Sequence, residues 1–174
     1  YWLVEMAGLP YGLFGEMLQG GGNPWRGMLY GMSSRLGWGG DPALRAQLRG
    51  KAALFGSMLH VTPAGTFKAV AAVAAHESAF NPSGGNIDSN PYGSLALPGR
   101  RIVADAGANA LIEVLANGRT RTFAVLPMIP APPFPREPVP TSVAEGPEGE
   151  PYVGQLTGFP LILNTAQVLR VSRD

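Results

Sequence analysis

One stretch of the sequence, residues 88–118, restricts the possible folds more than any other. It holds three short apolar segments, which are separated by turn-forming residues at 98–99 and 106–109 and followed by Asn117 and Gly118. An Asn-Gly pair favours a two-residue hairpin with a type I′ turn, because both central positions of that turn need positive φ angles. Three strands within about 30 residues cannot bury their apolar faces alone, so similar units must pack on either side.

Copies of this unit are indicated elsewhere in the chain. The motif at 102–107, an apolar run followed by an acid and a glycine, recurs at residues 2–8, and the strand pattern returns at 141–158. Placing Val103 over Val153 spaces the copies 50 residues apart, within the range of about 40–50 residues typical of propeller blades. The later copy carries an insertion around residues 159–165.

The pattern predicts an all-β fold: a β-propeller of NHL-like blades, about half of a six-bladed ring, with one or two short helices in the loops. Residues 1–174 would form a single partial propeller domain, with blade units at 1–50, 51–86, 87–139 and 140–174. The 24 glycines and 17 prolines disfavour long helices. An ordinary β-meander or sandwich is the alternative to a propeller.

Composition excludes several classes of partner. The formal net charge is +1, which argues against binding to nucleic acid, and no apolar run approaches the length of about 18 residues that a membrane span needs. The chain has no cysteine, so it has neither disulfides nor thiolate ligands. It begins and ends within strand-like patterns, and we therefore expect further blades of the same chain to complete the ring.

Four segments together resemble the ScyD/ScyE family, NHL-like β-propeller proteins named for a scytonemin pigment cluster: DSNPYGSLALPG, RIVADAGANALIEV, VPTSVAEGPEG and PYVGQLTGFP. The resemblance covers about residues 26–172. It implies an exported bacterial protein, periplasmic or extracellular, linked to secondary-metabolite biosynthesis. Gln155 departs from the family pattern, since family members more often carry an acid there.

Three polar residues occupy the same place in the three copies, namely Glu5, Asp105 and Gln155. In a propeller these strand ends would converge around the central channel. Carboxylate oxygens facing one axis suit a hard cation such as Ca²⁺, which makes Glu5 and Asp105 the candidate metal ligands. The alternative is that each side chain caps a backbone N–H of the turn that follows it.

The candidate ligand-binding residues lie in the best preserved copy: Asp88, Asn90, Asp105 and Asn109. Asp and Asn side chains in a turn before a proline can bind a cation or a ligand hydroxyl, or can close an Asx turn.

His60 and His76 are the only histidines of the chain, and neither has the spacing of a known metal motif. His76 precedes Glu77, a pair that could act in acid–base chemistry or metal binding. We expect structural positions for both histidines.

The leading hypothesis is a binding scaffold for a small molecule or a protein, without a cofactor and without enzymatic activity. The alternative is a Ca²⁺-dependent propeller enzyme of the lactonase or lyase kind, in which Glu, Asp and Asn hold the ion at the channel mouth. The alternative depends on analogy of fold alone.

Overall fold

The computed structural model describes residues 17–19, 27–30, 54, 56–61, 66–159 and 161–172. The described part is mostly β-structure, with eleven strands and one helix, α2 (Val73–Phe80). The strands of the first sheet are β1 (Met17–Gln19), β2 (Gly27–Tyr30), β3 (Ser57–Val61) and β4 (Phe67–Ala72). Those of the second are β5 (Pro91–Leu97), β6 (Arg100–Asp105), β7 (Ala110–Leu115) and β8 (Thr120–Val125). Those of the third are β9 (Pro140–Glu145), β10 (Pro151–Gln155) and β11 (Gln167–Arg170).

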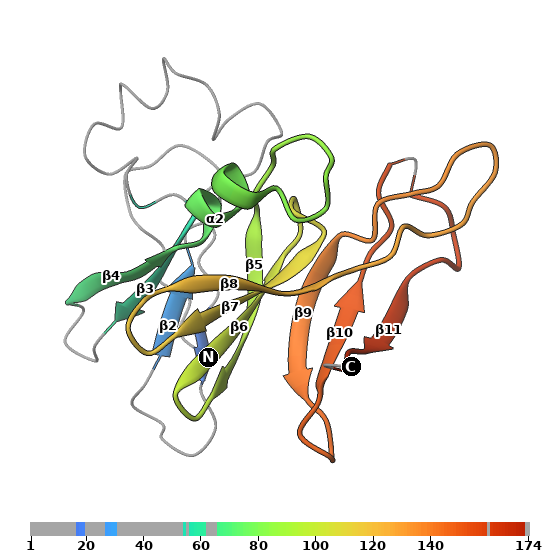
Figure 1. Cartoon of the computed structure of the whole chain (residues 1–174). Coiled ribbons are helices and arrows are strands. Elements are labelled where there is room, and N and C mark those ends of the chain that lie inside the picture. The colour runs from blue at the N-terminus through green and yellow to red at the C-terminus, as the bar shows by residue number, and fades with distance from the viewer. Residues whose placement is uncertain are drawn as a thin grey trace.

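Each sheet is an antiparallel meander in which strands that are consecutive in the chain pair with each other. Figure 1 shows the second sheet between the other two, with α2 and the long connections gathered above them. The sequence prediction of an all-β chain is confirmed at this level, and the described strands form no closed barrel. The strands β1–β4 belong to one sheet, which spans the first two blade units expected from the sequence.

The second sheet is buried on both faces, which explains its continuous apolar runs. Side chains alternate between the two faces of a strand. Val103, Ile112 and Val114 therefore pack toward the first sheet, in a core that includes Met58 and Val73. Their neighbours on the same strands form a second core with the third sheet, made of Leu97, Ile102, Ala104, Leu111, Leu126, Val143 and Val153.

The first strands of the second and third sheets approach each other closely. A Cβ atom added at Gly93 on β5 would lie 2.7 Å from the carbonyl oxygen of Thr141 on β9. Only a residue without a side chain fits this approach. Gly93 therefore sets the distance at which the two sheets pack.

The second and third sheets have the same internal register. Pro91, which begins β5, pairs with Asp105, which ends β6. Pro140, which begins β9, pairs with Gln155, which ends β10. A register shift occurs at this pairing in both sheets. Asp105 and Gln155 are thus structurally equivalent, as the alignment of Val103 with Val153 predicts.

The hairpin between β7 and β8 has a turn of a different type from the one predicted. Gly118 has a φ angle of 82°, but Asn117 is not among the residues with positive φ, so a type I′ turn is wrong. The amide of Gly118 donates to the carbonyl of Leu115 at 2.9 Å, and the amide of Leu115 donates to the carbonyl of Arg119 at 2.9 Å. This is a tight turn followed by a glycine bulge, which suits strands of strong right-handed twist.

The other predicted elements have mixed outcomes. The hairpin expected within 54–70 is β3 and β4, and the alanine-rich stretch 71–80 forms α2. The proline-rich connection after β8 holds an isolated bridge between Ile129 and Arg136 and no strand. The strand expected near residue 2 and the helix expected at 43–49 lie outside the described residues. Within the described part, no helix is long and apolar enough to cross a membrane.

Candidate functional site

The four predicted ligand-binding residues all lie at one end of the second sheet, which we call the connection end. It is the end where β6 finishes at Asp105, where β5 and β7 begin, and where α2 and the long loops lead from sheet to sheet (Figure 1). The polypeptide crosses this end several times, because the second meander enters and leaves there, the first leaves there and the third enters there. Residues distant in sequence are therefore brought together.

Asp105 is the hydrogen-bonding centre of this end. It is fully buried, and its carboxylate accepts hydrogen bonds from the hydroxyl of Ser89 at 2.6 Å and from the backbone amides of Asn90 at 2.7 Å and Ala108 at 3.1 Å. Burial raises the pKa of Asp105, and these donors, with the amide of Gly107, oppose the rise. The geometry is that of a cap which ties residues 88–90 to the turn at 106–109.

The turn and the segment 88–90 also touch through their backbones. The amide of Ala106 donates to the carbonyl of Asn90 at 2.9 Å. A Cβ atom at Gly107 would meet backbone atoms of Asp88, Ser89 and Asn90 at 3.0 Å. The glycine of the repeated motif is thus required for this close approach.

Asn109 anchors the proline-rich connection at both of its ends. Its φ angle is 54°, a left-handed conformation that Asn tolerates well. Its carbonyl accepts from the amide of Leu126 at 2.9 Å, and its side-chain oxygen accepts from the amide of Val139 at 3.2 Å. The side chain predicted to bind a ligand therefore holds the loop that leads to the third sheet.

Three amide side chains at this end keep an oxygen that accepts no hydrogen bond. They are Oδ1 of Asn81, Oδ1 of Asn90 and Oε1 of Gln155, all shielded from solvent. A buried acceptor without a donor is uncommon in proteins and is costly. Gln155 thus keeps the position of Asp105 in the third sheet but not its full set of hydrogen bonds.

Glu77 on α2, which the sequence offers only as a partner of His76 in acid–base chemistry or metal binding, also lies at the connection end. Its side chain is 1% exposed, and neither carboxylate oxygen has a hydrogen-bond partner. Burial raises the pKa of Glu77, and the charges of Asp105 and Asp88 raise it further. The backbone amide of Asp88 lowers the pKa, although its geometry falls short of a hydrogen bond. The signals in the sequence were its adjacency to His76 and its place as an acid within an alanine-rich stretch.

His76, the neighbour of Glu77, attaches α2 to β8. Its ring nitrogens lie 3.1 Å from the hydroxyl oxygen of Thr120 and 2.9 Å from that of Thr122. Its ring also packs against Phe80, with centroids 4.7 Å apart. Burial lowers the pKa of His76. His60 is half-buried on β3. The contacts of His76 are those of a packing residue.

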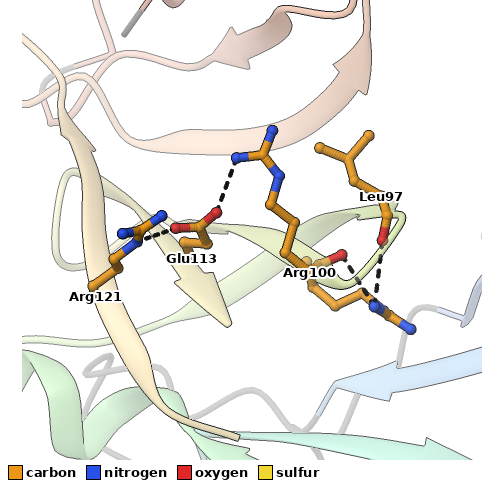
Figure 2. Close-up of polar contacts among 5 residues, drawn as sticks. Leu97, Arg100, Glu113 and Arg121 are labelled. Carbon is orange, nitrogen blue, oxygen red and sulfur yellow. Dashed lines mark hydrogen bonds and ion pairs between the residues drawn. The ribbon is translucent and has the colours of Figure 1, made fainter. Parts of the chain in front are cut away.

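A third buried carboxylate, Glu113 on β7, lies between two arginines (Figure 2). Nη1 of Arg100 donates to it at 2.9 Å, and Nε of Arg121 donates to its other oxygen. Glu113 raises the pKa of Arg121 through this hydrogen bond and through its charge. The sequence analysis did not single out this cluster, although the hairpin register places Glu113 opposite Arg121.

The predicted metal ligands are not brought together within the described residues. Glu5 lies outside them, so the pairing of Glu5 with Asp105 has no described geometry. Within the described part, no three acidic or histidine side chains lie close enough to share a metal ion.

The comparisons with known proteins bear on the first 37 residues. The family model of the TIM-barrel domain of glycoside hydrolase 123 matches residues 1–37, about a fifth of the chain. No curated protein and no solved structure matches the chain. Within the matched segment β1 and β2 pair antiparallel, whereas the strands of a TIM barrel are parallel.

The resemblance to the ScyD/ScyE family is wrong, because the family match found is a different one. The quoted segments are rich in turn residues and short apolar runs, which recur in many β-proteins, so they carry little family information. The expectations of export and of a link to pigment biosynthesis lose the resemblance on which they depended.

Proposed function

We propose that this chain is a propeller-like binding module, in which each sheet serves as one blade and a loop at the connection end recognises a protein partner. The shared register of the second and third sheets supports the blade interpretation. So do the two separate cores on either face of the second sheet, an arrangement expected of stacked repeats.

The observation that carries the binding proposal is the loop between β10 and β11. In the second sheet the equivalent connection is the four-residue turn 106–109, whereas here it spans the eleven residues 156–166. Insertions in repeat proteins map to loops on one face, which is often the binding face. The inserted loop contains no charged residue.

The loop exposes large apolar side chains. Phe159 is 90% exposed, Leu163 is 85% exposed and Leu161 is 68% exposed. Phe134 and Met128, on the proline-rich connection, are exposed as well. Large apolar side chains that are exposed together on one loop often mark an interaction site, because their burial against a partner is favourable by about 25 cal/mol per Å².

The conformation of the loop is held by its own hydrogen bonds. The amides of Leu156 and Gly158 donate to the carbonyls of Val139 and Glu137, at 3.0 and 2.9 Å. The hydroxyls of Thr157 and Thr165 are in contact and close the loop across its base. A loop held in this way loses little conformational entropy when it binds.

A protein partner fits this loop better than a small molecule. Small ligands bind in concave sites that enclose most of their surface, whereas Phe159 and Leu163 project almost completely into solvent. Projecting apolar side chains suit insertion into a groove on another protein.

The test compares three baits: the natural chain, a Phe159→Ser, Leu163→Ser double variant, and a Phe67→Ser control. Phe67 is exposed at the start of β4, on a different hairpin. Proteins enriched from the source cells would be purified, and their Kd values measured for all three baits. We expect the double variant to weaken the Kd at least tenfold (about 1.4 kcal/mol) and the control to leave it unchanged. Equal Kd values for all three baits, or no enriched protein, would refute the proposal.

A further inference from the structure

Glu77 has no counter-charge among the described residues, and the backbone amide of Asp88 is the one described group that favours its ionised form. Its side chain is almost completely buried, and both carboxylate oxygens lack a hydrogen bond. Within the described residues no lysine, arginine or histidine forms an ion pair with it. A buried ionised carboxylate without a counter-charge is strongly unfavourable, and such a group keeps its proton or moves to water.

The groups around Glu77 increase this cost. Asp105, at the end of β6, and Asp88, in the segment 81–90, both act on it as negative charges. α2 also packs against β3 and β8. On β3 the titratable side chain is His60, and on β8 the cation is Arg121, which binds Glu113.

The carboxylate oxygens of Asp105 do not accept a hydrogen bond from Glu77, because they already accept from Ser89, Asn90 and Ala108. The neighbouring histidine does not bond to Glu77 either, since both ring nitrogens of His76 face threonine hydroxyls on β8. Within this environment the neutral acid is the form of Glu77 that fits the closed arrangement.

We propose that Glu77 is a pH-sensitive switch: its neutral acid holds the end of α2 and the segment 81–90 closed against the second sheet, and its ionisation opens them. The segment stays attached at its two ends, while opening breaks the contacts of His76 with Thr120 and Thr122. Val73 is buried in the first core, and Asn90 is bonded to Asp105 and Ala106. Residues between these anchors can move Glu77 into water without unfolding either sheet. Opening displaces Phe80 and Ile87, which are exposed at the connection end.

The sign of the pH dependence follows from the raised pKa of Glu77, whose ordinary value is 4.5. Below that value the acid is neutral in both the open and the closed forms, so the closed form keeps its full stability. As the pH rises toward the raised pKa, the open form loses its proton first and becomes favoured. The opening constant then grows by about tenfold per pH unit and levels off above the raised pKa.

The test is hydrogen exchange of the 174-residue chain between pH 5 and pH 8, with rates corrected for the intrinsic pH dependence of exchange. Protection of residues 73–90 should fall with pH, while that of β7 stays constant. In Glu77→Gln, which keeps the shape of the neutral acid, the protection of 73–90 should not fall as the pH rises, and protonation of His76 should instead lower it below pH 6.5. Glu137→Gln, at an exposed acid of the proline-rich connection, should behave as the natural chain does.

A carboxyl-carbon NMR titration of Glu77 in the natural chain gives a readout that needs no variant. We expect a midpoint clearly above 4.5. A midpoint near 4.5 would overturn the proposal, as would equal pH dependence of residues 73–90 in the natural chain and in Glu77→Gln.

Discussion

Ser89 and Asp105 are joined by a buried hydroxyl–carboxylate hydrogen bond of 2.6 Å, which links the segment before β5 to the end of β6. Two backbone amides, from Asn90 and Ala108, donate to the same carboxylate. The carboxylate thus joins two stretches of chain that lie 15 residues or more apart in sequence. Its structural role is to hold residues 88–90 against the turn at 106–109, and so to shape the connection end.

The cap at Asp105 can be tested by comparing two substitutions. Asp105→Ala leaves the buried amides of Asn90 and Ala108 without acceptors, and we expect a loss of about 3–4 kcal/mol in the free energy of unfolding. Asp105→Asn keeps one acceptor oxygen and can donate to Ser89, so a loss of about 1 kcal/mol is expected. Urea unfolding measures both, with the exposed Glu148→Gln as control. Equal losses for Asn and Ala, together with stabilisation by calcium, would favour a cation ligand instead.

The close approach of β5 and β9 predicts a large effect for a small change. Gly93→Ala places a methyl group 2.7 Å from the carbonyl oxygen of Thr141, so the sheets must separate, at a cost of about 1–3 kcal/mol. Gly85→Ala meets nothing closer than 3.8 Å and should change stability by less than about 0.5 kcal/mol. Thermal unfolding distinguishes the two variants. A Gly93→Ala protein as stable as the control would mean that the sheets do not pack as described.

The second sheet was the most predictable part of the fold, for physical reasons. Its strands are short apolar runs between turn residues, and burial on both faces makes each run continuous. The equivalence of Asp105 and Gln155 followed from aligning Val103 with Val153, because the spacing of strands within a repeat is regular. The type of turn at Asn117 was not predictable, since it depends on the twist of the finished hairpin.

The contacts of the candidate site could not be predicted from the local sequence. Asp105 meets Ser89 only because β5 and β6 pair, and Glu77 is buried only because α2 folds over β3 and β8. Both depend on packing between elements, for which a single sequence has no local signal. The pair of Glu113 and Arg121 is different. The hairpin register alone places these residues opposite each other, so cross-strand pairing could have identified it.

His76 predicts a loss of stability on the acid side. Burial lowers the pKa of His76 below its ordinary value of 6.5, so the unfolded chain takes up a proton first as the pH falls below 6.5. Stability from this group is therefore complete above pH 6.5 and declines below it. Because Glu77 acts in the opposite direction, the comparison is made in the Glu77→Gln background.

In that background, the added substitution His76→Gln should reduce the fall in unfolding free energy between pH 7 and pH 5. Urea unfolding at several pH values gives the slope of unfolding free energy against pH for Glu77→Gln and for the double variant. Identical slopes with and without His76 would show that its ring is not buried as described. A Ser78→Ala control, on the exposed side of α2, should leave the slope unchanged.

The cluster at Glu113 predicts strongly non-additive losses. The side chain of Glu113 is 0% exposed, whereas those of Arg100 and Arg121 are 28% and 57% exposed. Arg121→Gln removes one largely solvated partner while Arg100 still neutralises the carboxylate, so we expect only a small loss in the free energy of unfolding. Arg100→Gln, the less exposed partner, should cost about 1–2 kcal/mol.

Replacing both arginines removes the two counter-charges that are described for the buried carboxylate. We expect that double variant to lose about 3–5 kcal/mol, more than the sum of the single losses. Adding Glu113→Gln to it should restore part of the stability, because the buried negative charge is then gone. Urea unfolding of the natural chain and the four variants measures the coupling. Additive losses, or no recovery with Glu113→Gln, would mean that water rather than the two arginines solvates this carboxylate.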